Sequence, residues 1–182
     1  MVVGLVVMVC LGVLILWCMY TYNAFKEKQI QIDLWWDEVD VHLQLRRELI
    51  PSLLDRARLI MDAQGDILER ISSVREEIVR ELIDTNSLLE SSELEQFENR
   101  LSREVHSLKN AFRSRREAQL NPDLLMVMSE LDSIEGRAVI ACEEYNKHTS
   151  DFNSSMKNFP AKLVVGFLHF HPLEKRIFGK WE

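Results

Sequence analysis

The chain has 182 residues, enough for one domain of ordinary size and a membrane anchor. Its formal net charge of -7 excludes nonspecific nucleic-acid binding as a general role, so no nucleic acid is expected among its partners. Only 6 glycines and 4 prolines are present, and this scarcity favours long helices over many strands and turns. The cysteines Cys10, Cys18 and Cys142 form no CxxC pair and predict no disulfide framework.

The first predicted element is a membrane-spanning helix, which we assign to residues 1–22. No charged residue occurs from Val2 to Tyr20, and a helix of this length covers about 28 Å, close to the hydrocarbon thickness of a bilayer. A cleaved signal peptide would carry a basic n-region and a small-residue cleavage site, and neither is present. Trp17, Tyr20 and Tyr22 are expected at the membrane interface.

The basic residues after the span set its predicted orientation. Lys26, Lys28, Arg46 and Arg47 all follow the span, and no basic side chain precedes it. The positive-inside rule then places the N-terminus outside and the rest of the chain in the cytoplasm.

A heptad pattern follows the anchor. Its positions are Trp36, Val39, Leu43, Arg46, Ile50, Leu53, Ala57, Ile60, Gln64, Ile67, Ile71, Val74 and Ile78. Because the phase continues through Pro51 and Gly65, we expect one helix from the membrane to about Leu82, kinked near the proline. The alternative is two helices that meet at Gly65, with Asp66 in the first turn of the second.

Two further helices are predicted. Thr85–Ser92 is a polar break, and Ser92 with Glu95 forms a capping box for a helix with apolar positions Leu94, Phe97, Leu101, Val105, Leu108 and Phe112. Asn121-Pro122-Asp123 ends this helix and starts the next, which Phe159-Pro160 closes. The apolar positions of that helix are Leu124, Val127, Leu131, Ile134, Ala138, Ala141, Tyr145, His148 and Phe152. The predicted fold is therefore all-α, a transmembrane helix continuing into an antiparallel bundle of three to four long helices over residues 23–160.

Several positions are expected at contacts between helices or subunits: Trp35, Trp36, Ile50, Pro51, Ile71 and Tyr145. Trp35 and Trp36 are adjacent and cannot both face one seam, so one of them is expected against lipid headgroups or a second subunit.

Arg46 is a charged residue at a core position of the heptad, and an unpaired buried guanidinium would be costly. We predict a structural ion pair with Glu130 or Glu135 of the last helix. In the alternative, the arginine extends outward along its own helix.

Residues 161–182 form a basic, aromatic tail with Phe167, Phe170, Phe178 and Trp181. Five basic and two acidic residues over 157–182 give a charge of +3 (5 − 2), in contrast to the acidic chain. The tail either lies on an anionic leaflet or packs on the bundle or a neighbouring subunit.

No pattern predicts an enzyme, a cofactor or a metal centre. His169 and His171 lie two residues apart without an evident third ligand. The chain contains no Gly-rich phosphate loop, nucleophile elbow or HExxH motif.

Short segments distributed along the chain carry a family resemblance. They are Tyr22-Asn23, Trp36, Val39-Asp40-Val41-His42-Leu43, Arg46, Leu49-Ile50-Pro51, Leu101-Ser102, Pro122-Asp123-Leu124, Leu131, Glu135, Arg137, Tyr145-Asn146, Phe159-Pro160 and Gly166-Phe167. In order and approximate spacing the chain resembles the LemA family. The resemblance implies a helical bundle on an N-terminal anchor in the bacterial cytoplasmic membrane, with no established enzymatic activity.

The sequence departs from the family pattern at three places. The paired arginines usual in the family fall on Leu45 and Arg46, so only the second is kept. The asparagine usual after the proline is Ser52, and the tyrosine usual before Pro-Asp-Leu is Asn121. A polar site of the family around these positions would be altered here.

The helix seams favour lateral self-association, and we expect a homo-oligomeric membrane scaffold in the form of a ring or cage. The lipid bilayer is then one partner and a second copy another. The alternative is a monomeric or dimeric adaptor that docks a partner protein in envelope stress or signalling.

Overall fold

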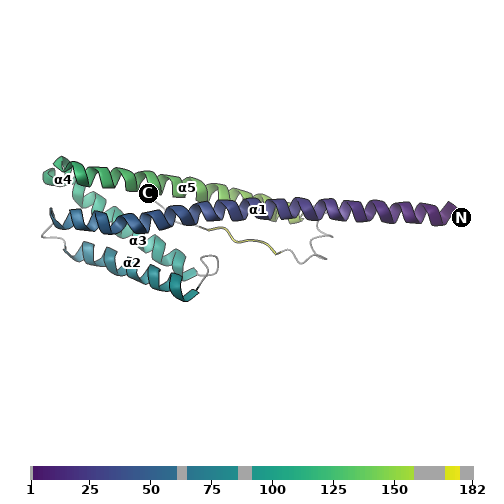
Figure 1. Ribbon diagram of the computed structural model, residues 1–182, viewed down its shortest axis with the longest axis horizontal. Coiled ribbons are helices and arrows are strands. Elements are labelled where there is room, and N and C mark those ends of the chain that lie inside the picture. The colour runs from purple at the N-terminus through teal and green to yellow at the C-terminus, as the bar shows by residue number, and fades with distance from the viewer. Residues whose placement is uncertain (1, 61–64, 86–91, 158–170, 177–182) are drawn as a thin grey trace. The chain divides into compact units, whose positions relative to one another are not determined.

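The computed structural model describes residues 2–60, 65–85, 92–157 and 171–176. They form five helices, namely α1 (Val2–Arg58), α2 (Gly65–Thr85), α3 (Ser92–Arg113), α4 (Arg116–Leu120) and α5 (Pro122–Lys157) (Figure 1). This part of the chain contains no strand, so the predicted all-α fold is confirmed.

The chain divides into two compact units, and α1 and α5 each contribute to both. We call Met1–Trp36 with Glu143–Lys175 the anchor unit. We call Asp37–Cys142 with Arg176–Glu182 the bundle unit.

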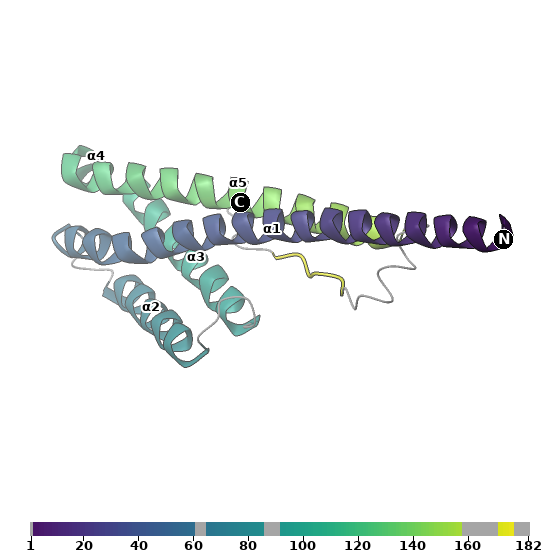
Figure 2. The ribbon, with the colours of Figure 1, turned by 45° about the vertical axis from the view of Figure 1, so that its right-hand side comes forward.

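The bundle unit is built around one apolar core. Side chains of all five helices meet in this core, among them Ile50 of α1, Ile71 of α2, Leu108 of α3, Ala118 of α4 and Leu124 of α5. Helices α2 and α3 pack side by side as an antiparallel hairpin (Figures 1 and 2). The heptad positions predicted from the sequence supply most of these buried side chains.

The prediction of one helix from the membrane to about Leu82 is wrong. Helix α1 ends at Arg58 and α2 begins at Gly65, with Asp66 in its first turn, as the alternative had it. Ala57 and Ile71 are both fully buried in the same core and lie two heptads apart in sequence. The register therefore continues across the connection because both helices turn the same face to one core.

The second predicted helix is also interrupted. Helix α3 ends at Arg113, and Arg115 has an extended backbone before the short helix α4. Phe112 and Ala118 are both buried on either side of this break, so the chain changes direction while it keeps its apolar face in the core. The Ser92 side chain of the proposed capping box lies outside the described residues.

The predicted start of the last helix at Asn121-Pro122-Asp123 is confirmed. Pro122 is the first residue of α5, and the Leu124 backbone N–H donates to the Asn121 side-chain oxygen at 3.0 Å. Asn121 is therefore the N-cap of α5. Pro122 suits the first position of the helix because its φ is fixed near the helical value and the backbone N–H that it lacks would have no helical acceptor there.

Replacing Asn121 with alanine is expected to lower the free energy of unfolding by about 1 kcal/mol, because a backbone donor of α5 loses its acceptor. Chemical denaturation followed by circular dichroism measures this change. Replacement of the exposed Asn110 serves as the control and should leave stability almost unchanged.

In the anchor unit, α1 and α5 form an antiparallel pair. The ring of Phe25 meets Phe152 at 5.7 Å between centroids, and Trp36 meets Tyr145 at 5.3 Å. Early residues of α1 thus contact late residues of α5, as antiparallel helices require.

The expectation that Trp35 or Trp36 contacts lipid headgroups or a second subunit stays a prediction, and within the chain both rings lie against α5. Trp36 is buried, and half-buried Trp35 stacks on His148 of α5 with 6.3 Å between ring centroids. Neighbouring residues differ by about 100° around a helix, and two indole rings are large enough to reach α5 from both sides of the seam.

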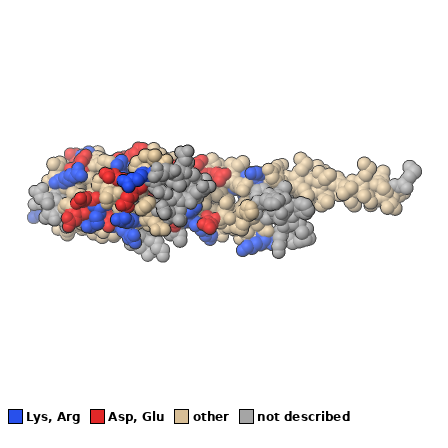
Figure 3. All heavy atoms as spheres, turned by 90° about the horizontal axis from the view of Figure 1, so that it is seen from below, with Lys and Arg blue, Asp and Glu red and all other residues tan. Residues whose placement is uncertain are grey.

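The first part of α1 is the apolar stretch predicted to be the membrane anchor. Among the described residues, α1 is the one helix long and apolar enough to cross a membrane. Side chains from Val2 to Leu16 are exposed, and Figure 3 shows this part of the helix without charged atoms. Farther along, acidic and basic side chains intermingle on the face shown.

Candidate functional site

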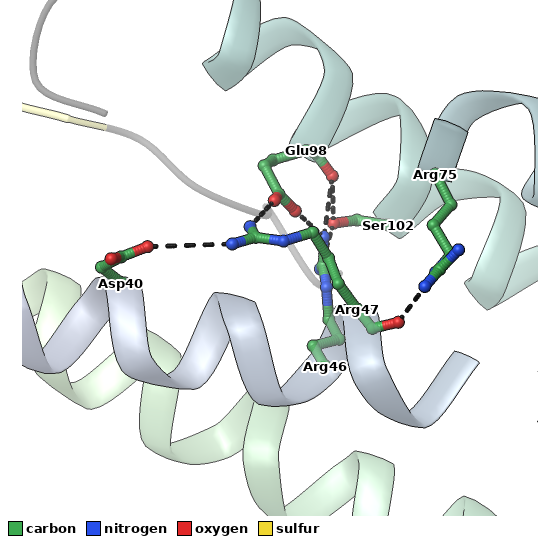
Figure 4. A network of polar contacts seen from close by, with 6 residues as sticks. All are labelled: Asp40, Arg46, Arg47, Arg75, Glu98 and Ser102. Carbon is green, nitrogen blue, oxygen red and sulfur yellow. Dashed lines mark hydrogen bonds and ion pairs between the residues drawn. The ribbon is translucent and has the colours of Figure 1, made fainter. Parts of the chain in front are cut away.

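Two adjacent arginines of α1 and one glutamate of α3 form a buried polar network in the bundle unit (Figure 4). Arg46 Nη2 and Arg47 Nη1 each donate to a different carboxylate oxygen of Glu98. Arg46 also donates to Ser102 Oγ at 2.8 Å and to the Glu98 carbonyl at 3.3 Å. Ser102 Oγ in turn donates to the same carbonyl at 2.7 Å.

The network is almost completely withdrawn from water. The side chains of Arg46 and Glu98 are each 1% exposed and that of Arg47 is 8% exposed. Two guanidinium groups share Glu98, and Asp40 adds a second carboxylate at 3.8 Å from Arg47 Nη2. Each guanidinium group therefore has at least one carboxylate within ion-pairing distance.

The structure pairs Arg46 with a carboxylate, but the predicted partners are wrong. Glu98 takes the place assigned to Glu130 or Glu135, because Arg46 faces α3 rather than α5. Glu130 is exposed, and Glu135 pairs instead with Lys109. The heptad pattern identifies buried positions but does not say which helix lies opposite.

Glu98 could have been found in the sequence. It lies three residues before Leu101, where the spacing of Leu101, Val105 and Leu108 calls for a core position. Its apolar neighbour Phe97, predicted at that position, is half-buried, whereas Glu98 is buried.

Arg75 of α2 compensates for the proline in α1. Pro51 has no backbone N–H, so the carbonyl of Arg47, four residues earlier, lacks its usual helical donor. Arg75 Nε donates to this carbonyl at 3.0 Å (Figure 4). Helix α1 continues through Pro51 to Arg58.

This arrangement predicts that Pro51 and Arg75 are energetically coupled. Arg75→Ala alone should cost about 1 kcal/mol, because the carbonyl of Arg47 loses its donor. In a Pro51→Ala background the restored backbone N–H supplies that bond, and the cost should shrink. A double-mutant cycle on the unfolding free energy tests this, and strictly additive costs would contradict it.

Asp40 lies at the edge of the network. Burial raises the pKa of its carboxyl above the ordinary value; Arg47 opposes this shift, and the carboxylates of Glu98 and Asp37 add to it. In the folded protein Asp40 therefore keeps its proton at pH values where the unfolded chain has lost it. Stability from this group falls as pH rises from the ordinary aspartate range through the raised pKa and is then constant.

Replacing Asp40 with asparagine should remove this pH dependence and leave the protein at least as stable at neutral pH. Unfolding free energies measured between pH 4 and 7 would show a flatter profile than that of the unchanged protein. A clear loss of stability at neutral pH would mean that the ion pair with Arg47 outweighs the cost of burial.

A second polar group joins α3 to α5 within the bundle unit. Lys109 Nζ donates to Asp132 Oδ1 at 2.6 Å and to Glu135 Oε2. The side chains of Lys109 and Glu135 are mostly buried, and that of Asp132 is largely exposed. Together, the two groups connect α3 to both α1 and α5.

The geometry supports a structural role for both groups. Each buried cation is held by carboxylates of the same unit. In the ranges that the structure describes, no three His, Cys, Asp or Glu side chains are placed to hold a metal ion. His171 is exposed, and His169 lies outside these ranges.

The remaining predicted positions divide into three groups. Ile50, Ile71 and Tyr145 are buried as packing residues, and Pro51 is half-buried. Trp17 is half-buried, and Tyr20 and Tyr22 are exposed at the end of the apolar stretch. The aromatic tail residues Phe167, Phe170, Phe178 and Trp181 lie outside the described residues.

Comparison with known proteins identifies the family of this chain. The LemA family model matches residues 35–179, most of the chain, and this range includes both polar groups described above. No curated protein matches the sequence. This is not a known enzyme family, and the apolar first part of α1 fits a membrane-associated helical protein. On the extent of this match, the chain belongs to the LemA family.

Proposed function

We propose that the protein is a non-enzymatic scaffold of the bacterial cytoplasmic membrane whose copies associate side by side through α1 into a ring or cage. The support for this proposal is an apolar surface on α1 that continues beyond the anchor. It consists of Ile30, Leu34, Val41 and Leu45, all exposed, and we call it the α1 stripe.

The spacing of the α1 stripe suits a partner helix. Its members follow one another by four, seven and four residues and fall within roughly 60° of the helix circumference. A narrow apolar stripe of this kind is typical of a helix that packs along another helix. Asp37 interrupts the stripe, and a polar residue at such a position sets the register of the partner.

The anchor favours a second copy as that partner. Copies inserted in one bilayer share orientation and depth, so their α1 stripes are presented at the same height. Confinement to a membrane also raises the effective concentration of each copy for its neighbours. A weak contact along α1 is then sufficient for assembly.

The orientation proposed for the anchor places the N-terminus outside and the bundle unit in the cytoplasm, because the basic residues follow the span. Single cysteines at Val2 and Ser114, in a background without Cys10, Cys18 and Cys142, test it. An impermeant thiol reagent should reach the two positions from opposite sides of the membrane. Labelling from one side only would overturn this topology.

The particle mass of the full-length protein in mild detergent, measured by light scattering, tests self-association. We expect a large, uniform particle that Leu34→Glu converts to a small one. Ile140→Glu is the matched control, since Ile140 of α5 is 60% exposed and Leu34 is 56% exposed. A monomer-sized or dimer-sized particle for the unchanged chain would overturn the scaffold.

One observation favours the second candidate, an adaptor for a partner protein. Three apolar side chains are strongly exposed: Leu59 directly after α1, Leu120 at the end of α4 and Met126 in the second turn of α5. Arg113 and Arg116 are exposed nearby in sequence. Apolar and basic side chains together fit an acidic amphipathic segment. An adaptor would form a small particle and lose its partner on replacement of these side chains.

A further inference from the structure

An extended segment near the C-terminus is held on α5 within the anchor unit. Residues 171–175, drawn in yellow in Figures 1 and 2, have no helical structure. Asn153 Nδ2 donates to the Leu173 carbonyl at 2.7 Å, and the Leu173 N–H donates to Asn153 Oδ1 at 2.9 Å. Tyr145 Oη adds a bond to the Glu174 carbonyl at 3.1 Å.

These bonds recognise the main chain of the segment. The amide of Asn153 satisfies both the donor and the acceptor of one residue, as a neighbouring strand would. Tyr145 likewise donates to a main-chain carbonyl of the segment. The face of α5 that carries Tyr145 and Asn153 is thus a docking site for an extended peptide, and it makes the same bonds to any copy of that peptide.

The connection to the segment is long enough to reach another copy. Residues 158–170 separate the end of α5 from the segment, and 13 residues reach at most about 47 Å when extended. Packed helices lie about 8–10 Å apart. Confinement to a membrane keeps neighbouring copies at a high effective concentration, so the docking site of a neighbour can compete with that of the same chain.

We propose that in the assembled protein the segment 171–175 of one copy docks on Tyr145 and Asn153 of the next copy, so that each subunit holds its neighbour by its C-terminal segment. This inference rests on the proposed self-association and names a second contact that would stabilise it. Exchange of identical segments between copies is a low-cost route to assembly.

Thiol cross-linking in membranes tests the exchange. Ser150→Cys in one tagged copy and Glu174→Cys in a differently tagged copy are coexpressed without the native cysteines and treated with a short bifunctional thiol reagent. Ser150 lies one turn before Asn153 on α5, and the Glu174 side chain is exposed, so neither change removes a docking bond. We expect a cross-linked dimer that contains both tags.

Two controls define the result. In the first control, Asp151→Cys is used in place of Ser150→Cys. Residue 151 lies on the far side of α5 from Asn153, about 200° around the helix, so no cross-linked dimer is expected. Asn153→Ala should abolish the cross-linked dimer, whereas Ser154→Ala should leave it unchanged.

The outcome separates this inference from the proposed function. In a parallel experiment, Ser150→Cys and Glu174→Cys are placed in the same chain. Cross-linking only within that chain, with no mixed dimer from the coexpressed copies, would overturn the exchange. If the same preparation is a large particle by light scattering, self-association stands without the exchange. If it is monomer-sized, both proposals are overturned.

Discussion

Replacing Glu98 with glutamine is expected to lower the free energy of unfolding by about 3–5 kcal/mol, because two buried guanidinium groups lose their shared carboxylate. Arg47 retains Asp40, but Arg46 retains only Ser102 and the Glu98 carbonyl among the bonds described above. The measurement is denaturant unfolding of the full-length protein in detergent, followed by circular dichroism.

Two companion variants make the Glu98 result specific. Glu104→Gln, on the same helix α3, removes an ion pair to the exposed Arg70 and should cost about 0.5 kcal/mol or less. Arg46→Met combined with Glu98→Gln leaves Arg47 opposite Asp40 and should recover most of the loss. Equal costs for Glu98→Gln and Glu104→Gln would contradict a buried network.

Replacing Ile71 with aspartate is expected to unfold the bundle unit. Ile71 is fully buried in the core between helices, and an unpaired carboxylate there costs several kcal/mol. A loss of the cooperative thermal transition, measured by circular dichroism, is the expected result.

Ile83 is the matched control for Ile71. It lies on the same helix α2 and is 73% exposed, so Ile83→Asp should change the unfolding free energy by about 0.5 kcal/mol or less. Unchanged melting of the Ile71 variant would show that the heptad positions are not the core of this protein.

Periodicity predicted the buried faces of the helices but not their neighbours. The buried positions of α1, α2, α3 and α5 follow the spacing read from the sequence, and Asn121-Pro122 marks a true helix boundary. A heptad phase that runs through Gly65 has two physical explanations, one continuous helix or a hairpin with both helices facing one core. The sequence pattern is identical in the two cases, so only tertiary packing distinguishes them.

For the polar network, the sequence predicts that Arg46 has a carboxylate partner but not which helix supplies it. Arg46 stands at a core position, and the cost of a bare buried charge requires a carboxylate partner. Helix order in space decides whether that partner comes from α3 or α5, and periodicity contains no information on order. The heptad pattern does not predict Arg47 as part of the buried network, because Arg47 lies outside the heptad positions. Its role can be inferred only once Glu98 is recognised as buried.

The bond from Arg75 to the Arg47 carbonyl also means that the hydrogen bonding of α1 is complete only once α2 is in place. As the polypeptide leaves the ribosome, the anchor emerges first and can enter the bilayer by its length and apolarity alone. The turn before Pro51 lacks the hydrogen bond to the Arg47 carbonyl until Arg75 has been synthesised and α2 packs against α1. The apolar first part of α1 does not depend on α2 for its hydrogen bonds, whereas the turn before Pro51 does.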